Sequence, residues 1–230
     1  MRVGIMGAPG SGKTTAALTF PKPIVLSYDS KEPEGTTIVP FFDKEFETSL
    51  TRDMPNNYKG VRGALLKWLR TEARRAESGT TFILDSWTHL FNALDIWHEA
   101  MAPVLFMTKS REIDAYAAHR DRLLFAQEIF REIKSLPYTF VITFHEQIDR
   151  DSDGRPTGFL KPLMKGQFAD QAASHLSIFV RQVIIQGPRY VWDVGASPIF
   201  HSILPVNFKR VELIENRYIP ASYQELVKRL

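Results

Sequence analysis

A glycine-rich segment near the start of the chain constrains the fold more than any other feature. Residues 7–14 read Gly-Ala-Pro-Gly-Ser-Gly-Lys-Thr, and they lie between the apolar run Arg2–Met6 and a helix predicted from about Lys13 to Phe20. Glycines let backbone N–H groups turn inward around a compact anion, where a Cβ would obstruct the wrap. The start of a helix adds unpaired N–H groups and a partial positive charge. The segment therefore predicts a strand–turn–helix unit that binds phosphate.

The last residues of this segment extend the prediction from phosphate to a nucleotide. The pattern Gly-x-x-x-x-Gly-Lys-Thr between a strand and a helix is the P-loop signature. Lys13 is placed to reach the β- and γ-phosphates of ATP, and the Thr14 hydroxyl to bind Mg²⁺. A chance match in a glycine-rich turn is the alternative, and the position at a strand–helix junction argues against it. The residues expected to bind the nucleotide are Gly7, Ala8, Pro9, Gly10, Ser11, Gly12, Lys13, Thr14 and Thr15.

Apolar runs alternate with helical patterns as far as residue 146. Strands are predicted at 2–6, 24–28, 81–85 and 138–144, helices at about 13–20, 61–77, 87–102 and 111–135, and mostly irregular chain at 31–60. Strands that are apolar throughout and separated by helices indicate a mostly parallel central sheet flanked by helices. Further along, the sequence predicts a hairpin over 178–186 and 189–194, a strand near 211–214 and a helix over 222–230. The prediction is an α/β fold with a C-terminal antiparallel hairpin extension.

The composition fits one globular domain without a membrane segment. The chain has 230 residues, no cysteine and a formal net charge of +3. No apolar stretch reaches the length of a membrane helix, and the lack of cysteine suits a reducing cytoplasm. The net charge permits nucleic-acid binding without requiring it. We expect a single cytoplasmic domain over 1–230, with a nucleotide-binding core at 1–146, a distinct segment at 147–170 and a C-terminal extension at 171–230.

An aspartate ends the strand predicted at 81–85. Asp85 follows the apolar tripeptide Phe-Ile-Leu, an arrangement typical of a carboxylate that holds Mg²⁺ beside the P-loop hydroxyl. The carboxyl ends of parallel strands form the ligand-binding edge of such sheets, which favours this interpretation. The alternative is an aspartate that begins a turn or caps the helix after Ser86. The sequence therefore predicts Thr14 and Asp85 as the metal-binding pair.

Hydrolysis of ATP needs a group that activates or orients water near the γ-phosphate. Asp29 is the first candidate because it lies nearest the end of the second strand, followed by Glu32 and, at a greater distance, Glu34. The alternative for each is a charge on a solvated loop. His145 ends the fourth strand at the same edge, where it would sense the γ-phosphate unless it is simply bonded locally. The predicted catalytic residues are Lys13, Asp29, Glu32, Asp85 and His145.

Taken together, these motifs resemble those of a known group of ATPases. The loop at 7–14, the strand end Leu84-Asp85-Ser86 and the strand end Thr143-Phe144-His145-Glu146 resemble RecA-like phage ATPases, in particular the short Sak-type recombinases of single-strand annealing systems. The resemblance spans roughly residues 1–185. It implies a RecA-like P-loop fold, Mg²⁺-dependent ATP hydrolysis and action on single-stranded DNA as a homo-oligomeric ring or filament. A single-strand-binding or annealing protein is a further implied partner.

The same resemblance implies roles for particular residues. Asp29 would activate water, and His145 would couple the nucleotide to a DNA-binding loop at about 147–170. That loop holds the cations Arg150, Arg155, Lys161 and Lys165, with Phe159 and Phe168 between them. Cations bind phosphates and aromatic rings stack on bases, which suits a single strand. A surface hairpin with solvated basic residues is the alternative. The candidates for a cation supplied to the neighbouring subunit are Lys209 and Arg210, with Arg181 and Arg189 also open.

Two other functions remain compatible with the sequence. A nucleotide-gated loader or adaptor would bind ATP with little hydrolysis. A nucleoside or nucleotide kinase would transfer phosphate to a small molecule. The pair Asp121-Arg122 is similar to an Asp-Arg pair of nucleotide kinases, but it lies inside a predicted helix and not after a strand. The kinase is therefore the less favoured of the two.

Overall fold

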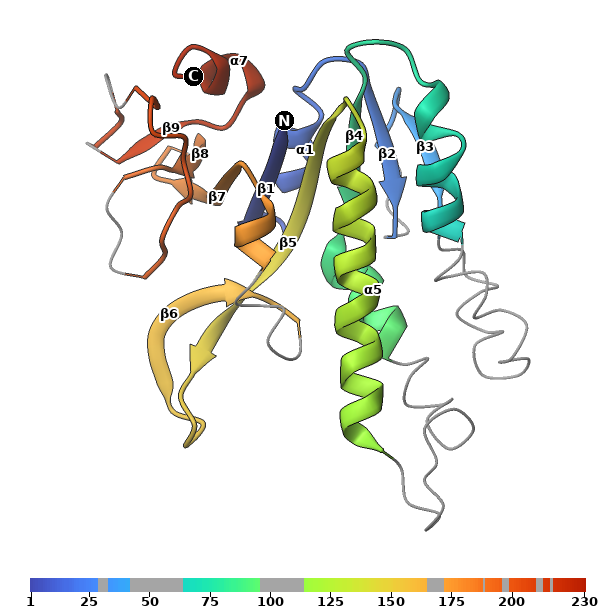
Figure 1. The fold of residues 1–230 in the computed structure, drawn as a ribbon. Helices are drawn as coiled ribbons and strands as arrows, with labels where there is room; N and C mark the ends of the chain where they lie inside the picture. The colour runs from blue at the N-terminus through green and yellow to red at the C-terminus, as the bar shows by residue number, and fades with distance from the viewer. Residues whose placement is uncertain are drawn as a thin grey trace.

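The computed structural model of the chain is built around one large sheet (Figure 1). It describes residues 1–28, 33–41, 64–95, 114–164, 172–187, 189–195, 199–209, 213–215 and 217–230. Of the residues singled out from the sequence, Asp29, Glu32, Lys165, Phe168 and Arg210 lie outside the described residues.

Among the described residues, the sheet has nine strands and is parallel across its centre. The strands are β1 (Arg2–Gly7), β2 (Pro23–Ser27), β3 (Thr37–Pro40), β4 (Thr81–Asp85), β5 (Thr139–Arg150), β6 (Pro156–Pro162), β7 (Ile178–Ile185), β8 (Arg189–Asp193) and β9 (Tyr218–Pro220). Their order is β3-β2-β4-β5-β1-β7-β8-β9, and β6 pairs with β5. Neighbours from β3 to β7 are parallel, whereas β8 and β9 add an antiparallel edge. The strand that leads into the glycine-rich loop, β1, therefore lies between β5 and β7.

Helices cover both faces of the sheet. They are α1 (Lys13–Ala17), α5 (Ala115–Ser135), α7 (Tyr223–Val227), the 3-10 turns Ala73–Arg75 and Ala172–His175, and the helical residues 64–70 and 87–95. On one face, α5 packs with the helical residues 64–70 and 87–95 over an aromatic-rich core. On the other face, α1 and α7 pack over valine, isoleucine and alanine side chains. Among the described residues, no helix has both the length and the apolar character needed to cross a bilayer.

The alternation of side chains along the central strands decides which residues reach the glycine-rich loop. On β4, Phe82 packs in the α5 core and Ile83 in the α1 core. On β5, Val141 also packs in the α1 core. Since successive side chains of a strand point to opposite faces, Asp85 and Thr143 emerge on the α1 face. That face is the one on which the glycine-rich loop passes into α1.

The predicted α/β class, with a mostly parallel sheet and an antiparallel C-terminal extension, is confirmed, and the structure differs from the prediction in local details. Thr37–Pro40 forms the edge strand β3 inside the region predicted to be irregular; its exposed first and last residues hide the apolar signal. The helix predicted at 61–77 is helical at 64–70 and then tightens, because the Thr71 N–H is shared between the Lys67 and Trp68 carbonyls. Half of the strand predicted near 211–214 lies outside the described residues; of the rest, Ile214 forms an isolated bridge, and the last described strand is β9.

A larger difference concerns the segment predicted as a loop from residue 147. β5 does not end near Phe144 but continues to Arg150, and β6 returns antiparallel to it, so the described part of this segment is a β-hairpin. The hairpin extends past the end of the central strands (Figure 1). Residues after Phe144 leave the core and become partly exposed, so the continuous apolar signal of a buried strand stops although the strand itself does not.

A buried ion pair holds β9 and the chain before it against β8. The Arg217 guanidinium donates to both carboxylate oxygens of Asp193, at 3.0 and 2.6 Å, and Asp193 is only 1% exposed. These hydrogen bonds raise the pKa of Arg217 above its ordinary value. The Arg217 carbonyl also accepts from the N–H groups of Val194 and Gly195. The almost fully buried carboxylate of Asp193 thus holds the antiparallel extension in place.

Replacing Arg217 with methionine should lower the free energy of unfolding by about 3 kcal/mol, because the substitution leaves the buried Asp193 carboxylate without its counter-ion. Urea denaturation followed by circular dichroism measures the change. The matched control is Arg189→Met, an exposed arginine at the start of β8 that bonds only the Gln186 carbonyl among the described residues. The control should change stability by about 0.5 kcal/mol or less. Equal losses in the two variants would contradict a special role for the pair.

Candidate nucleotide-binding site

The glycine-rich loop leaves the end of β1 and returns into α1. β1 pairs in parallel with β5, with Gly7 opposite His145, so the loop begins beside that histidine. Gly10 and Gly12 adopt φ values of 76° and 83°, in the left-handed region that a residue with a side chain rarely enters. Gly12 is the N-cap of α1. The backbone therefore forms the curved loop that the sequence pattern predicts, and α1 begins at the end of this loop.

The ammonium of Lys13 lies over the loop. Its Nζ donates to the carbonyl oxygens of Gly7 at 3.0 Å and Ala8 at 2.7 Å, and the residue is buried. A buried charge is tolerated only where such partners satisfy it. The cation is consequently held at the place where the loop would present phosphate oxygens.

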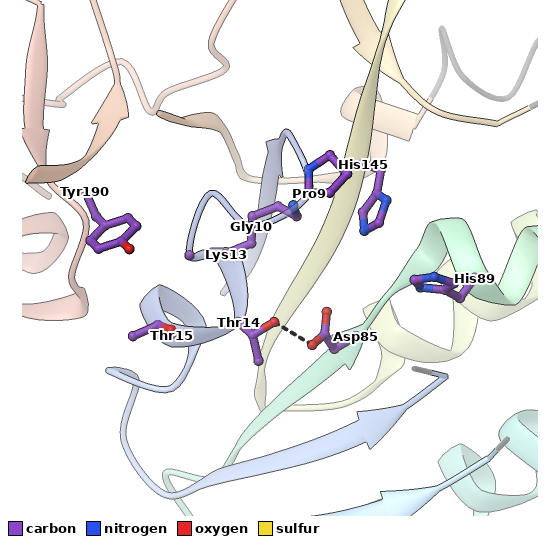
Figure 2. Close-up of a pocket in the computed structure, with 10 residues that line it drawn as sticks. Pro9, Gly10, Lys13, Thr14, Thr15, Asp85, His89, His145 and Tyr190 are labelled. Carbon is purple, nitrogen blue, oxygen red and sulfur yellow. Dashed lines mark hydrogen bonds between the residues drawn. The ribbon is translucent and has the colours of Figure 1, made fainter. Parts of the chain in front are cut away.

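The Asp85 carboxylate connects three elements of the site. Its Oδ2 accepts from Thr14 Oγ1 of α1 at 2.7 Å (Figure 2). Its Oδ1 accepts from Thr143 Oγ1 of β5 at 2.5 Å. Leu84 lies opposite Ile142 in the parallel register, which brings the next residues of β4 and β5 side by side. Asp85 is thereby fixed at both oxygens.

The oxygen donors at this point fit a magnesium ion. Mg²⁺ prefers hard oxygen ligands and is usually held by one or two protein groups together with substrate phosphates and water. The Thr14 hydroxyl and the Asp85 carboxylate supply that set, beside the Lys13 ammonium. In the described part of the chain, no group of three or more His, Cys, Asp and Glu side chains forms a metal cage by itself. A magnesium ion would therefore be held jointly with phosphate oxygens.

Two histidines line the same cavity. The ring centroids of His89 and His145 are 5.2 Å apart in an edge-to-face arrangement. Ser86 Oγ lies 2.7 Å from His89 Nδ1 and accepts from the His89 N–H, so it caps the helix at 87–95. The His145 N–H donates to Thr88 Oγ1. His89 was not predicted; the signal available was the Ser-x-x-His spacing directly after Asp85.

An aromatic ring from the C-terminal extension completes the cavity wall. A Cβ added to Gly12 would meet the Tyr190 ring at 2.7 Å, so the ring lies against the loop, and 49% of Tyr190 remains exposed. The cavity has a volume of about 430 Å³, and Tyr190 lies across the loop from Asp85 (Figure 2). Tyr190 escaped the sequence analysis, because no local pattern links a residue of β8 to the loop after β1.

The other predicted loop residues are distributed around this cavity. Pro9, Gly10 and Thr15 also line it. Ser11 is buried, and no described residue bonds its hydroxyl. Glu34, the third candidate base, is exposed in the turn before β3 and does not line the cavity.

Three of the cations proposed to act across a subunit boundary are described, and none of these three lines the cavity. Arg181 is held within the chain, donating to both oxygens of Glu146 at 2.8 and 3.1 Å. Arg189 is exposed at the turn into β8. Lys209 is exposed beside the C-terminal segment, where its N–H donates to the Arg229 carbonyl.

The cations of the β5–β6 hairpin are bonded within the hairpin itself. Lys161 Nζ lies 2.6 Å from Asp149, and the hydrogen bond from Lys161 holds the pKa of Asp149 below its usual value. Arg150 donates to the Gly154 carbonyl at 2.7 Å, and Arg155 lies 3.9 Å from Asp153. Phe159 is exposed, with its ring against His201. The structure thus places these cations together on the hairpin, and each of them has a partner within it.

Replacing Thr143 with valine should weaken Mg²⁺-dependent nucleotide binding by about tenfold, because the loss of one hydroxyl releases an oxygen of Asp85, the candidate metal ligand. Titration of a fluorescent ATP analogue with Mg²⁺ or with EDTA measures the effect. Binding in EDTA should be unchanged, and Thr143→Ser, which keeps the hydroxyl, should restore the magnesium dependence. An equal loss with and without Mg²⁺ would indicate a general structural defect instead.

A protein-family profile and a solved structure are similar to this chain. A protein-family profile described as "AAA domain" matches residues 1–201. A solved structure titled "Crystal structure of the RadB recombinase" is similar, with a TM-score of 0.40 and 13% identity, over 84% of this chain and 79% of that chain. A search of curated sequences found no significant match. The family match, the sheet topology and the loop conformation together confirm the predicted α/β P-loop NTPase fold class.

Proposed function

The chain belongs to the AAA domain family AAA_24, and from this premise we propose that it is a Mg²⁺-dependent ATP hydrolase that acts on single-stranded DNA. One observation carries the proposal: Lys13, Thr14 and Asp85 line one cavity, with the Thr14 hydroxyl 2.7 Å from the Asp85 carboxylate. Catalysis of phosphoryl transfer is mostly positioning and charge stabilisation, for which an ammonium and a metal-binding pair are the central parts. The class we propose is a phage RecA-like recombinase or a recombination accessory motor.

Each group has a defined task in this proposal. The Lys13 ammonium moves from the Gly7 and Ala8 carbonyls to the β- and γ-phosphate oxygens. Thr14 and Asp85 hold the magnesium ion, which when bound neutralises the charge that develops on the phosphates. Thr143 orients the Asp85 carboxylate through its hydrogen bond.

We assign the activation of water to Asp29, with Glu32 as the second choice. Support comes from the residues just before them. Ser27 lies opposite Asp85 in the parallel register of β2 and β4, and the Tyr28 N–H donates to the Asp85 carbonyl at 2.7 Å. The chain thus passes beside β4 at the residues immediately before Asp29, at the edge of the sheet that carries Asp85.

His145 is proposed as the residue that couples the nucleotide to the hairpin. It lines the cavity, contacts His89, and belongs to the same strand, β5, that continues outward into the hairpin. The next residue, Glu146, is fixed to β7 by Arg181. A change at the γ-phosphate would therefore reach the hairpin through one uninterrupted strand, without a loop between them.

Single-stranded DNA is the proposed substrate of the hairpin, and a homo-oligomeric ring or filament the proposed assembly. The exposed Phe159 ring suits base stacking. Arg150, Arg155 and Lys161 are the proposed DNA-facing cations of the hairpin, and Lys209 is the described candidate for a cation supplied to a neighbouring subunit. A single-strand-binding or annealing protein is the proposed protein partner.

Phosphate release from ATP should be Mg²⁺-dependent and should rise when single-stranded DNA is added. Lys13→Ala should lower the rate by roughly a hundredfold or more, because it removes a charge that stabilises the transition state. A coupled phosphate-release assay, with and without an oligonucleotide, measures both effects. Binding of ATP without turnover, even with DNA present, would instead support the nucleotide-gated adaptor, and transfer to a nucleoside or nucleotide would support the kinase.

Tyr190 should contribute to nucleotide affinity by offering its half-exposed ring to the base. Aromatic–base stacking accounts for about 1–3 kcal/mol when measured by alanine substitution, so Tyr190→Ala should weaken binding of a fluorescent ATP analogue by about tenfold. Tyr190→Phe keeps the ring and should bind as the unchanged protein does. If Tyr190→Ala remains folded and keeps its affinity, the ring is only a packing partner of Gly12.

A further inference from the structure

The outer face of α5 carries basic side chains along most of its length. Tyr116, Arg120, Arg131 and Lys134 are all exposed, and Tyr116 is 75% exposed. At 3.6 residues per turn, these four positions fall within an arc of about 60° on the helix surface. These four residues form the outer stripe of α5. The opposite side of α5 is the buried face, where Phe125 and Ile129 pack in the core.

The acids of α5 lie outside the outer stripe. Glu128 and Glu132 each accept from Arg70 at 2.8 Å, so they face the helical residues 64–70. Asp114 caps the helix by accepting from the Ala117 N–H. Asp121 falls on the flank of the helix, outside the arc. Among the described side chains of α5, the outer stripe therefore holds cations and no carboxylate.

Two cations of the outer stripe also lack partners within the described part of the chain. The structure gives Arg120 and Arg131 neither a hydrogen bond nor an ion pair with any described residue. Lys134 has its Nζ 3.2 Å from the His175 ring, and its carbonyl accepts from Arg2. A guanidinium without a counter-ion is available to bind an anion of a partner molecule.

The hairpin offers the opposite arrangement. Between residues 147 and 164 its three cations, Arg150, Arg155 and Lys161, are balanced by three acids, Asp149, Asp151 and Asp153. Forming a phosphate contact there would require breaking a contact such as that between Lys161 and Asp149. The sequence shows the cations of this segment, but only the structure shows the groups that each cation contacts. What the hairpin does expose is apolar surface, at Ile148 and Phe159.

We propose that the outer stripe of α5 binds the sugar–phosphate backbone of single-stranded DNA, while the hairpin contacts the bases. This inference rests on the proposed function, and it assigns the phosphate contacts to a different element. From Arg120 to Lys134 the stripe runs about 21 Å along the helix, enough for several phosphates of an extended strand. The N-terminal half of α5 and the hairpin extend past the central strands at the same edge of the sheet (Figure 1). One strand therefore can reach both.

The test is the salt dependence of DNA binding by the full-length chain. Each phosphate contact to a single strand contributes about 0.7 to the slope of log K against log salt concentration. The double variant Arg120→Gln/Arg131→Gln should reduce the slope by about 1.4 and weaken binding about tenfold at moderate salt. Fluorescence anisotropy of a labelled oligothymidine, measured at several salt concentrations with an ATP analogue present, gives both values.

A second double variant removes the same charge from other surfaces. Lys22→Gln/Lys67→Gln takes two exposed lysines that lie outside α5, and it should leave the slope close to that of the unchanged protein. Thermal melting and ATP-analogue binding confirm that both variants are folded. If the two double variants lose affinity equally, the outer stripe has no special role, although the proposed function stands. If the unchanged protein does not bind the oligothymidine, the proposed DNA substrate fails and the inference fails with it.

Discussion

The carboxylate of Asp85 is the point on which the candidate site depends. β4, which carries it, is not adjacent to β1, since β5 lies between them. The distance is bridged by α1, which brings Thr14 to one carboxylate oxygen, while Thr143 of β5 occupies the other. These contacts exist only because alternation along the strands puts both partners on the α1 face. A slip of β4 by one residue would send Asp85 into the aromatic core on the other face, and the same slip of β5 would send Thr143 there.

The parts that could be predicted from sequence are those whose signal is local. The glycine-rich loop needs left-handed backbone at Gly12. The pattern of neighbouring residues that predicts this loop is contiguous in the sequence. Asp85 ends an apolar run, and the alternating elements reveal the parallel sheet. Tyr190, His89 and Thr143 were missed because their roles arise from tertiary contacts: Tyr190 reaches Gly12 only after the C-terminal strands have folded back beside β7.

Charge was harder to interpret from sequence than apolarity. Basic residues after His145 suggested a surface that attracts phosphates, yet the hairpin places Lys161 against Asp149 across the two strands. On α5 the reverse holds, because Arg70 pairs with Glu128 and Glu132, while Arg120 and Arg131 bond no described residue. The sequence alone does not show which of these charges are paired. Whether a charge is matched is therefore a property of the fold, not of composition.

The continuity of β5 also has a mechanical consequence. The same strand runs beside the glycine-rich loop at His145 and forms one leg of the hairpin. Along its pairing with β6, the register first shifts between Ile148 and Arg150. Up to Ile148 the pairing is regular, and the ion pair between Glu146 and Arg181 holds this part of the strand against β7. A displacement of β5 at the cavity would therefore be passed along a regular strand as far as Ile148, where the register shift interrupts it.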